Sequence, residues 1–182
     1  GKSVIWIGGT ASNYAGDVLF TAGFANGNGI FRRRGKTLET LADSITAFRG
    51  PNGANYSWVD SYRGRYLALN SRGDAALIAT YGGTRTVIFW GSSGPQFIAQ
   101  QGLSTSAGVV NNFQSVAIDD NGQVMFTAAG ADGRMAAYHW NGASVRRVIG
   151  VGDPGPAGLT ANEISNIAGG LRGFTIVAAY GN

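Results

Sequence analysis

Short apolar segments alternate with polar turns along the whole chain. Residues 18–20, 75–77 and 124–126 are apolar runs of strand length, and each follows a turn that contains glycine. No segment sustains the 3.6-residue periodicity of an amphipathic helix. The pattern therefore predicts an all-β fold built from many short strands.

One turn-and-strand pattern recurs along the sequence. Asn or Asp opens a turn, a glycine closes it three residues later, and an apolar strand follows, with a degenerate fourth copy near the C-terminus. The turn glycines are Gly16, Gly73, Gly122 and Gly173, and they are 57, 49 and 51 residues apart. A glycine at this position is expected to adopt the left-handed conformation that closes a hairpin with a bulge.

The remainder of each unit also repeats. A third strand follows a glycine-containing hairpin at residues 86–90 and 135–140, and a fourth strand follows at 96–99 and 145–149. Four short strands in about fifty residues are typical of a β-propeller blade. We expect one propeller domain over residues 1–182, or a fragment of a larger propeller, with three full units and a partial fourth. The units lie near residues 3–50, 62–103, 112–152 and 163–182.

The N-terminal segment resembles a strand that the fourth unit lacks. Its residues Ser3, Val4, Ile5, Trp6 and Ile7 read like the third strand at 86–90. Three alternatives follow. The segment completes the last blade of its own chain and closes a four-bladed ring, it completes a blade of a neighbouring molecule, or it is simply the first strand of the first unit.

Charge and composition narrow the classes of function. The net charge is +4, and the only tight basic cluster is Arg32, Arg33 and Arg34, which forms either a solvated strand edge or a contact for a polyanion. The sequence has no cysteine, which excludes disulfides and thiolate zinc sites, and it has no apolar run of membrane-spanning length. We expect neither a nucleic-acid partner nor a membrane span.

Few residues could carry catalysis. His139 is the one histidine, and its place between Tyr138 and Trp140 favours a packed or surface side chain over a metal ligand. The acidic residues lie mostly in turns, where turn formation explains them. The run 119–122 weakly resembles a calcium loop but lacks the glutamate at position twelve. We expect no catalytic residue, metal or cofactor.

Aromatic residues supply the candidate binding sites. Trp6, Trp90 and Trp140 are expected at equivalent third-strand positions, where they either pack between blades or stack against sugars. A second group lies in the extended crossover loop at 49–62, where exposed aromatic side chains would form a contact patch. That group comprises Tyr56, Trp58 and Tyr62.

The repeats resemble those of tandem-repeat β-propeller proteins of bacterial secreted and cell-surface proteomes. Residues 68–73 and 117–126 match a phrase of the type A-L-N-x-x-G-x-V-A-F, and residues 87–98 and 137–149 match G-I-F-x-W-x-G. Residues 152–158 match G-D-P-x-P-G, whereas Arg32, Arg33 and Arg34 replace the aromatic of the first unit. The resemblance implies a secreted or cell-surface location and a binding or scaffolding role.

The expected function is therefore a non-enzymatic extracellular module for protein interaction or self-assembly. Its partners would be further copies of itself or other extracellular proteins. One alternative is a carbohydrate-binding propeller that uses the repeated tryptophans on glycans. A second alternative is a hydrolase whose carboxylates, such as those of Asp119 and Asp120, lie in the central channel.

Overall fold

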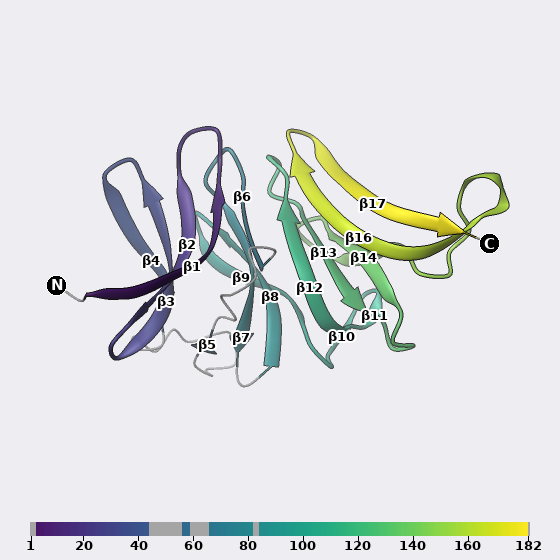
Figure 1. The fold of residues 1–182 in the computed structure, drawn as a ribbon, viewed down its shortest axis with the longest axis horizontal. Coiled ribbons are helices and arrows are strands. Elements are labelled where there is room, and N and C mark those ends of the chain that lie inside the picture. The colour runs from purple at the N-terminus through teal and green to yellow at the C-terminus, as the bar shows by residue number, and fades with distance from the viewer. Residues whose placement is uncertain (1–2, 44–55, 59–65, 82–83, 182) are drawn as a thin grey trace.

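The computed structural model describes residues 3–43, 56–58, 66–81 and 84–181. Its strands form antiparallel sheets that follow one another in chain order, and Figure 1 shows the larger sheets side by side in a row. The all-β class and the four-stranded antiparallel units predicted from the sequence are confirmed. No helix among the described residues is long and apolar enough to cross a membrane.

The first two sheets occupy the N-terminal half. Sheet 1 pairs β1 (Val4–Ser12), β2 (Val18–Phe24), β3 (Gly27–Arg34) and β4 (Thr37–Asp43) in that order. Sheet 2 contains β5 (Tyr56–Trp58), β6 (Leu67–Leu69), β7 (Ala75–Tyr81), β8 (Thr84–Gly91) and β9 (Gly94–Gln100). Both β5 and β6 pair with β7.

The C-terminal half begins with a short hairpin of β10 (Ser104–Thr105) and β11 (Gly108–Val109). Sheet 3 then pairs β12 (Asn111–Ile118), β13 (Val124–Ala129), β14 (Met135–Trp140) and β15 (Val145–Gly150). The 3-10 turn η2 (Pro156–Gly158) then leads to sheet 4, in which β16 (Thr160–Gly170) pairs with β17 (Gly173–Gly181).

Three of the sheets share one turn between their first and second strands. Gly16, Gly73 and Gly122 have φ angles of +82°, +78° and +80°, which favour glycine because a side chain is strained there. Each donates its backbone N–H to the carbonyl of the Asn or Asp that opens the turn, at 3.1, 3.0 and 3.0 Å. The repeat read from the sequence thus has one common geometry in these three sheets.

The fourth turn differs, and the prediction that Gly173 closes it in the left-handed conformation is wrong. Its φ lies outside that region. Four residues separate the paired Gly169 and Phe174, whereas five separate Ser12 from Val18 in the first sheet. The shorter turn shifts the register of β17 by one residue, so Phe174 takes the position that Val124 has in sheet 3.

Each sheet has two faces, because successive side chains of a strand point in opposite directions. In sheets 2 to 4, we call the face that packs on the preceding sheet the front face and the opposite one the back face. In sheet 1, the face that packs on sheet 2 is the back face and the opposite one is the front face. The back face of sheet 1 packs on the front face of sheet 2 through a core that contains Leu19, Ile30 and Trp90. The back face of sheet 2 packs on sheet 3, and that of sheet 3 on sheet 4, in the same way.

The segment Ser3–Ile7 leads into and forms the beginning of β1, which pairs with β2. This pairing agrees with the third of the three alternatives, in which the segment is the first strand of the first unit. The described sheets do not close into a ring, and Figure 1 shows sheet 1 and sheet 4 at opposite ends of the row. Completion of a blade in a neighbouring molecule stays a prediction.

Candidate interaction site

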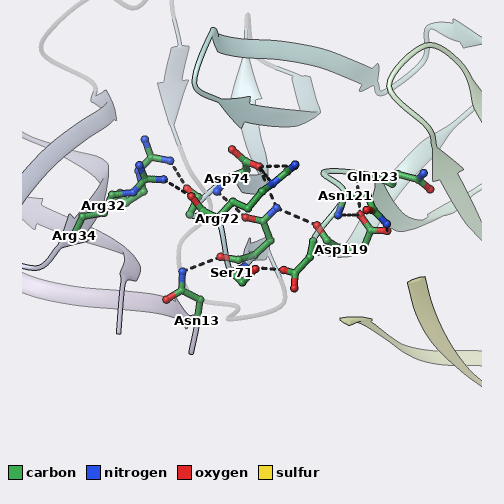
Figure 2. A network of polar contacts seen from close by, with 12 residues as sticks. Asn13, Arg32, Arg34, Ser71, Arg72, Asp74, Asp119, Asn121 and Gln123 are labelled. Carbon is green, nitrogen blue, oxygen red and sulfur yellow. Dashed lines mark hydrogen bonds and ion pairs between the residues drawn. The ribbon is translucent and has the colours of Figure 1, made fainter. Parts of the chain in front are cut away.

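A ladder of hydrogen bonds joins the first turns of the sheets along one side of the row (Figure 2). Asn13 donates from Nδ2 to the carbonyl of Asn70 at 2.8 Å, and Asn70 donates from Nδ2 to the carbonyl of Asp119 at 3.0 Å. Asp119 has no side-chain N–H, and the backbone N–H of Asp120 instead donates to Gly170 at 3.2 Å. The ladder therefore fixes the spacing of the four turns.

Arginines of β3 reinforce this junction. Arg32 is only 5% exposed, donates to Glu39 at 2.7 Å and also donates to the carbonyl of Gly73 in sheet 2. Arg34 donates to the carbonyl of Arg72 at 3.1 Å (Figure 2). For Arg32, both the solvated-edge interpretation and the polyanion interpretation are wrong, because its guanidinium is buried between two sheets.

The turns surround a hollow of about 690 Å³. All four sheets contribute to its wall, which combines apolar residues of the first strands with polar residues of the turns. Leu69 and Ile118 are two of the apolar residues, and the side chain of Tyr14 stands fully exposed at the rim. Sequence reasoning missed this hollow, although the repeated Asn/Asp-x-x-Gly turns were the signal for it.

Two of the three predicted third-strand tryptophans have equivalent positions. Trp90 pairs with Ala75, and Trp140 pairs with Val124, the corresponding residue of the next sheet. They are 7% and 5% exposed, and the Trp140 ring lies 5.5 Å from that of Phe89. This burial favours packing between sheets over sugar stacking.

The third tryptophan was misplaced, because Trp6 lies on the first strand β1. The position that corresponds to Trp90 and Trp140 in sheet 1 belongs to Arg33, which pairs with Val18. The sequence predicts that an arginine replaces the aromatic residue of the first unit, and in the structure that position is occupied by Arg33.

The loop aromatics are only partly placed. Tyr56 and Trp58 lie in β5, where Tyr56 pairs with Tyr81 and Trp58 with Thr80. Tyr62 lies outside the described residues. The contact patch predicted for these three residues stays a prediction.

His139 is held by contacts with neighbouring side chains, and these contacts lower its pKa. Its Nε2 lies 2.7 Å from Oε1 of Gln123, and Arg146 donates from Nε to its Nδ1 at 3.3 Å. The ring is 8% exposed and meets Phe174 of sheet 4 edge to face at 5.6 Å. Burial, and next the Arg146 charge, lower the pKa of His139 below its ordinary value. His139 is therefore a packed residue that joins sheets 3 and 4.

The carboxylates near the hollow are engaged in turns. Oδ1 of Asp119 accepts the backbone N–H groups of Asn121 at 3.0 Å and Gln123 at 2.8 Å. Asp120 accepts the backbone N–H of Ser71 at 2.8 Å. Across the part of the chain that the structure describes, no group of three or more His, Asp or Glu side chains could hold a metal ion.

Strand β1 carries the exposed apolar side chains of the segment Ser3–Ile7. Val4, Ile5 and Ile7 are 52%, 66% and 64% exposed. The pairing with β2 shifts register between Val4 and Trp6, so Ile5 has no partner residue on β2. The segment therefore contains a bulge at Ile5.

Comparisons with known proteins give little beyond this geometry. No model of a protein family matches the sequence, and no curated protein matches it. Among solved structures, the chain is similar to a triple arginine-to-alanine mutant of AofleA from Arthrobotrys oligospora, with a TM-score of 0.41 and 14% identity. The similarity covers 92% of this chain and 47% of that one, so this chain spans about half its length.

Proposed function

We propose that the chain is a β-propeller-type repeat module that acts by protein interaction and self-assembly outside the cell, rather than by catalysis. The strand edge of sheet 4 carries the proposal. In the three larger sheets, the second strand has hydrogen-bonded neighbours on both sides, whereas β17 pairs only with β16 among the described residues. An unpaired edge of this length is a template for an added strand.

The segment Ser3–Ile7 of another copy is the strand we propose for this edge. It has the apolar, β-favouring composition of a buried strand, but its side chains at positions 4, 5 and 7 are largely exposed. Adding it to β17 would bury these side chains and satisfy backbone groups along the edge. The gain would outweigh the loss of an irregular pairing with β2.

The test is the molar mass of the chain in solution over a range of protein concentrations, measured by light scattering. We expect discrete oligomers or filaments, and we expect deletion of residues 1–7 to abolish the assembly. A chain that stays monomeric at every concentration would remove the self-assembly proposal, and assembly that survives the deletion would remove the strand-addition mechanism.

A matched pair of substitutions separates the backbone from the side chain. Ile5 has no partner residue on β2, so Ile5→Pro should leave the monomer folded while removing an N–H from the added strand. We expect Ile5→Pro to weaken assembly at least tenfold and Ile5→Ala to weaken it much less. Equal effects of the two variants would mean that side-chain burial, and not strand pairing, drives association.

A further inference from the structure

The front faces of the four sheets follow one residue pattern. In sheets 1 to 3 it starts at the second-strand residue that pairs with the last strand residue before the turn: Val18, Ala75 and Val124. In sheet 4 it starts at Phe174, which pairs with Gly169, next to the closing pair of Gly170 and Gly173. Two residues later stands a large apolar side chain: Phe20, Leu77, Phe126 and Ile176. Four residues later stands an alanine in every sheet: Ala22, Ala79, Ala128 and Ala178. The four front faces are therefore versions of one surface.

Three of these front faces are covered by the back face of the preceding sheet. The front face of sheet 2, with Leu77 and Ala79, packs on Leu19 and Ile30 of sheet 1. The corresponding faces of sheets 3 and 4 pack on sheets 2 and 3. Within this chain, the same type of front face therefore packs against a back face in three successive interfaces.

The front face of sheet 1 has no such sheet against it among the described residues. At its centre, the Phe31 ring packs against those of Phe20 at 5.6 Å and Phe24 at 5.5 Å. Register places Val4, Ile7 and Leu38 on the same face, since they pair with Phe24, Ala22 and Arg33. These three are 52%, 64% and 61% exposed and lie on the edge strands β1 and β4, whereas Ala22 and Phe31 between them are buried. The face therefore presents apolar side chains to solvent along both of its edges.

The back face of sheet 4 is the matching uncovered surface. Since Ile176 and Ala178 pack on sheet 3, alternation turns Thr175, Val177 and Ala179 outward, and all three are exposed. Val177 is 51% exposed. The small and β-branched side chains resemble those that aromatic front faces meet inside the chain.

Charge also favours this pairing. The front face of sheet 1 carries the exposed Arg33 at the tryptophan position, while the back face of sheet 4 carries the exposed Glu163, which pairs with Ala179. Opposite charges on the two surfaces guide one register of approach and disfavour the contact of two like faces.

We propose that the front face of sheet 1 binds the back face of sheet 4 of a second copy of this chain. The proposal rests on the self-assembly function but uses a different contact from strand addition, because it keeps Val4 and Ile7 paired with β2. The contact is heterologous, since two different faces meet, so repetition leads to a closed ring or to an open filament. It continues between molecules the sheet-on-sheet interface that sheets 1 to 4 form within one.

The first experiment places a charge on each face and measures the dissociation constant by sedimentation. Leu38→Glu changes the front face and Val177→Glu the back face, and both side chains are already exposed, so the monomer should stay folded. We expect each to weaken self-association at least tenfold. Val177→Glu buries an unpaired charge in the contact. Leu38→Glu places a carboxylate beside Arg33, where it competes with Glu163 of the second copy for that guanidinium. Leu103→Glu, at a residue that is 57% exposed and lies on neither face, is the matched control and should have no effect.

The second experiment mixes the two variants. Leu38→Glu retains a normal back face and Val177→Glu a normal front face, so a mixture should form one-to-one dimers although neither variant assembles alone. A symmetric contact between two front faces predicts instead that Val177→Glu assembles like the original chain, and that result would overturn the proposal.

The outcomes separate this surface from the proposed function. Assembly that tolerates Leu38→Glu and Val177→Glu but fails in Ile5→Pro removes the face-to-face contact and leaves strand addition intact. Assembly that fails in the two face variants but tolerates Ile5→Pro supports the face-to-face contact. A chain that remains monomeric up to millimolar concentration removes both.

Discussion

Asn70 and Asp119 occupy the same position in successive turns. They differ in one group, since Asn70 has an amide NH2 where Asp119 has a second carboxylate oxygen. Both accept backbone N–H groups through Oδ1, but only Asn70 can donate from its side chain to the next turn. Asn70 is 3% exposed, and Asn70→Asp would also bring a second carboxylate to Asp74, which lies 3.1 Å away. We expect a loss of about 1–3 kcal/mol in the free energy of unfolding, measured with urea.

The reverse change is the control. Asp119→Asn keeps the acceptor for Gln123 and adds a donor, so its effect should be smaller than that of Asn70→Asp. Equal losses in the two variants would show that the step from Asn70 to the third turn adds nothing to stability.

His139 gives the fold a dependence on pH. Since the pKa of His139 is lowered in the folded protein, the unfolded chain binds more protons than the folded one once the pH falls to about the ordinary value of 6.5. The stability contributed by neutral His139 is present above pH 6.5 and is lost as the pH falls through this value toward the lowered pKa. We expect the urea concentration at the unfolding midpoint to decrease as the pH is lowered from 7.5 to 5.5. In His139→Gln it should stay nearly constant over this range, because the chain has no other histidine.

At the scale of the element, the three similar turns and the different fourth one make a graded series for glycine replacement. Gly16→Ala adds backbone strain at positive φ but meets no neighbour, so it should cost about 1–2 kcal/mol. Gly73→Ala should cost slightly more, because its methyl group displaces the flexible Arg34 guanidinium, which then loses its hydrogen bond to the carbonyl of Arg72. Gly173→Ala should be neutral or stabilising by up to about 1 kcal/mol. Urea unfolding of the three variants checks this order.

The same turns show what the sequence could and could not predict. Three hairpins follow from Asn or Asp and a glycine three residues later, since those residue types have few other roles in such a pattern. The register of β17 did not follow, because aligning Gly173 with Gly122 concealed a turn one residue shorter. Burial of Arg32 was also unpredictable, since its partner carbonyl at Gly73 is 41 residues away in sequence.

At the scale of the whole molecule, the repeat predicted the four-stranded antiparallel units but neither the extra strands β5, β10 and β11 nor how the sheets are joined. The residues of the hollow come from four turns, and hydrogen bonds from Asn13, Asn70 and Asp120 between neighbouring turns bring them together. Trp90 and Trp140 were recognised as equivalent, yet their burial follows from sheet packing that no single repeat contains.

Because the sheets are stacked in a line, each is held mainly by its neighbours, and sheet 4 has one neighbour and two strands. A fold of this kind need not open all at once. The amide hydrogens of β16 and β17 should exchange with deuterium through a local opening that leaves β13 and β14 protected. A second molecule seated on the back face of sheet 4 would close that opening, so the end of the row would become rigid only within an assembly.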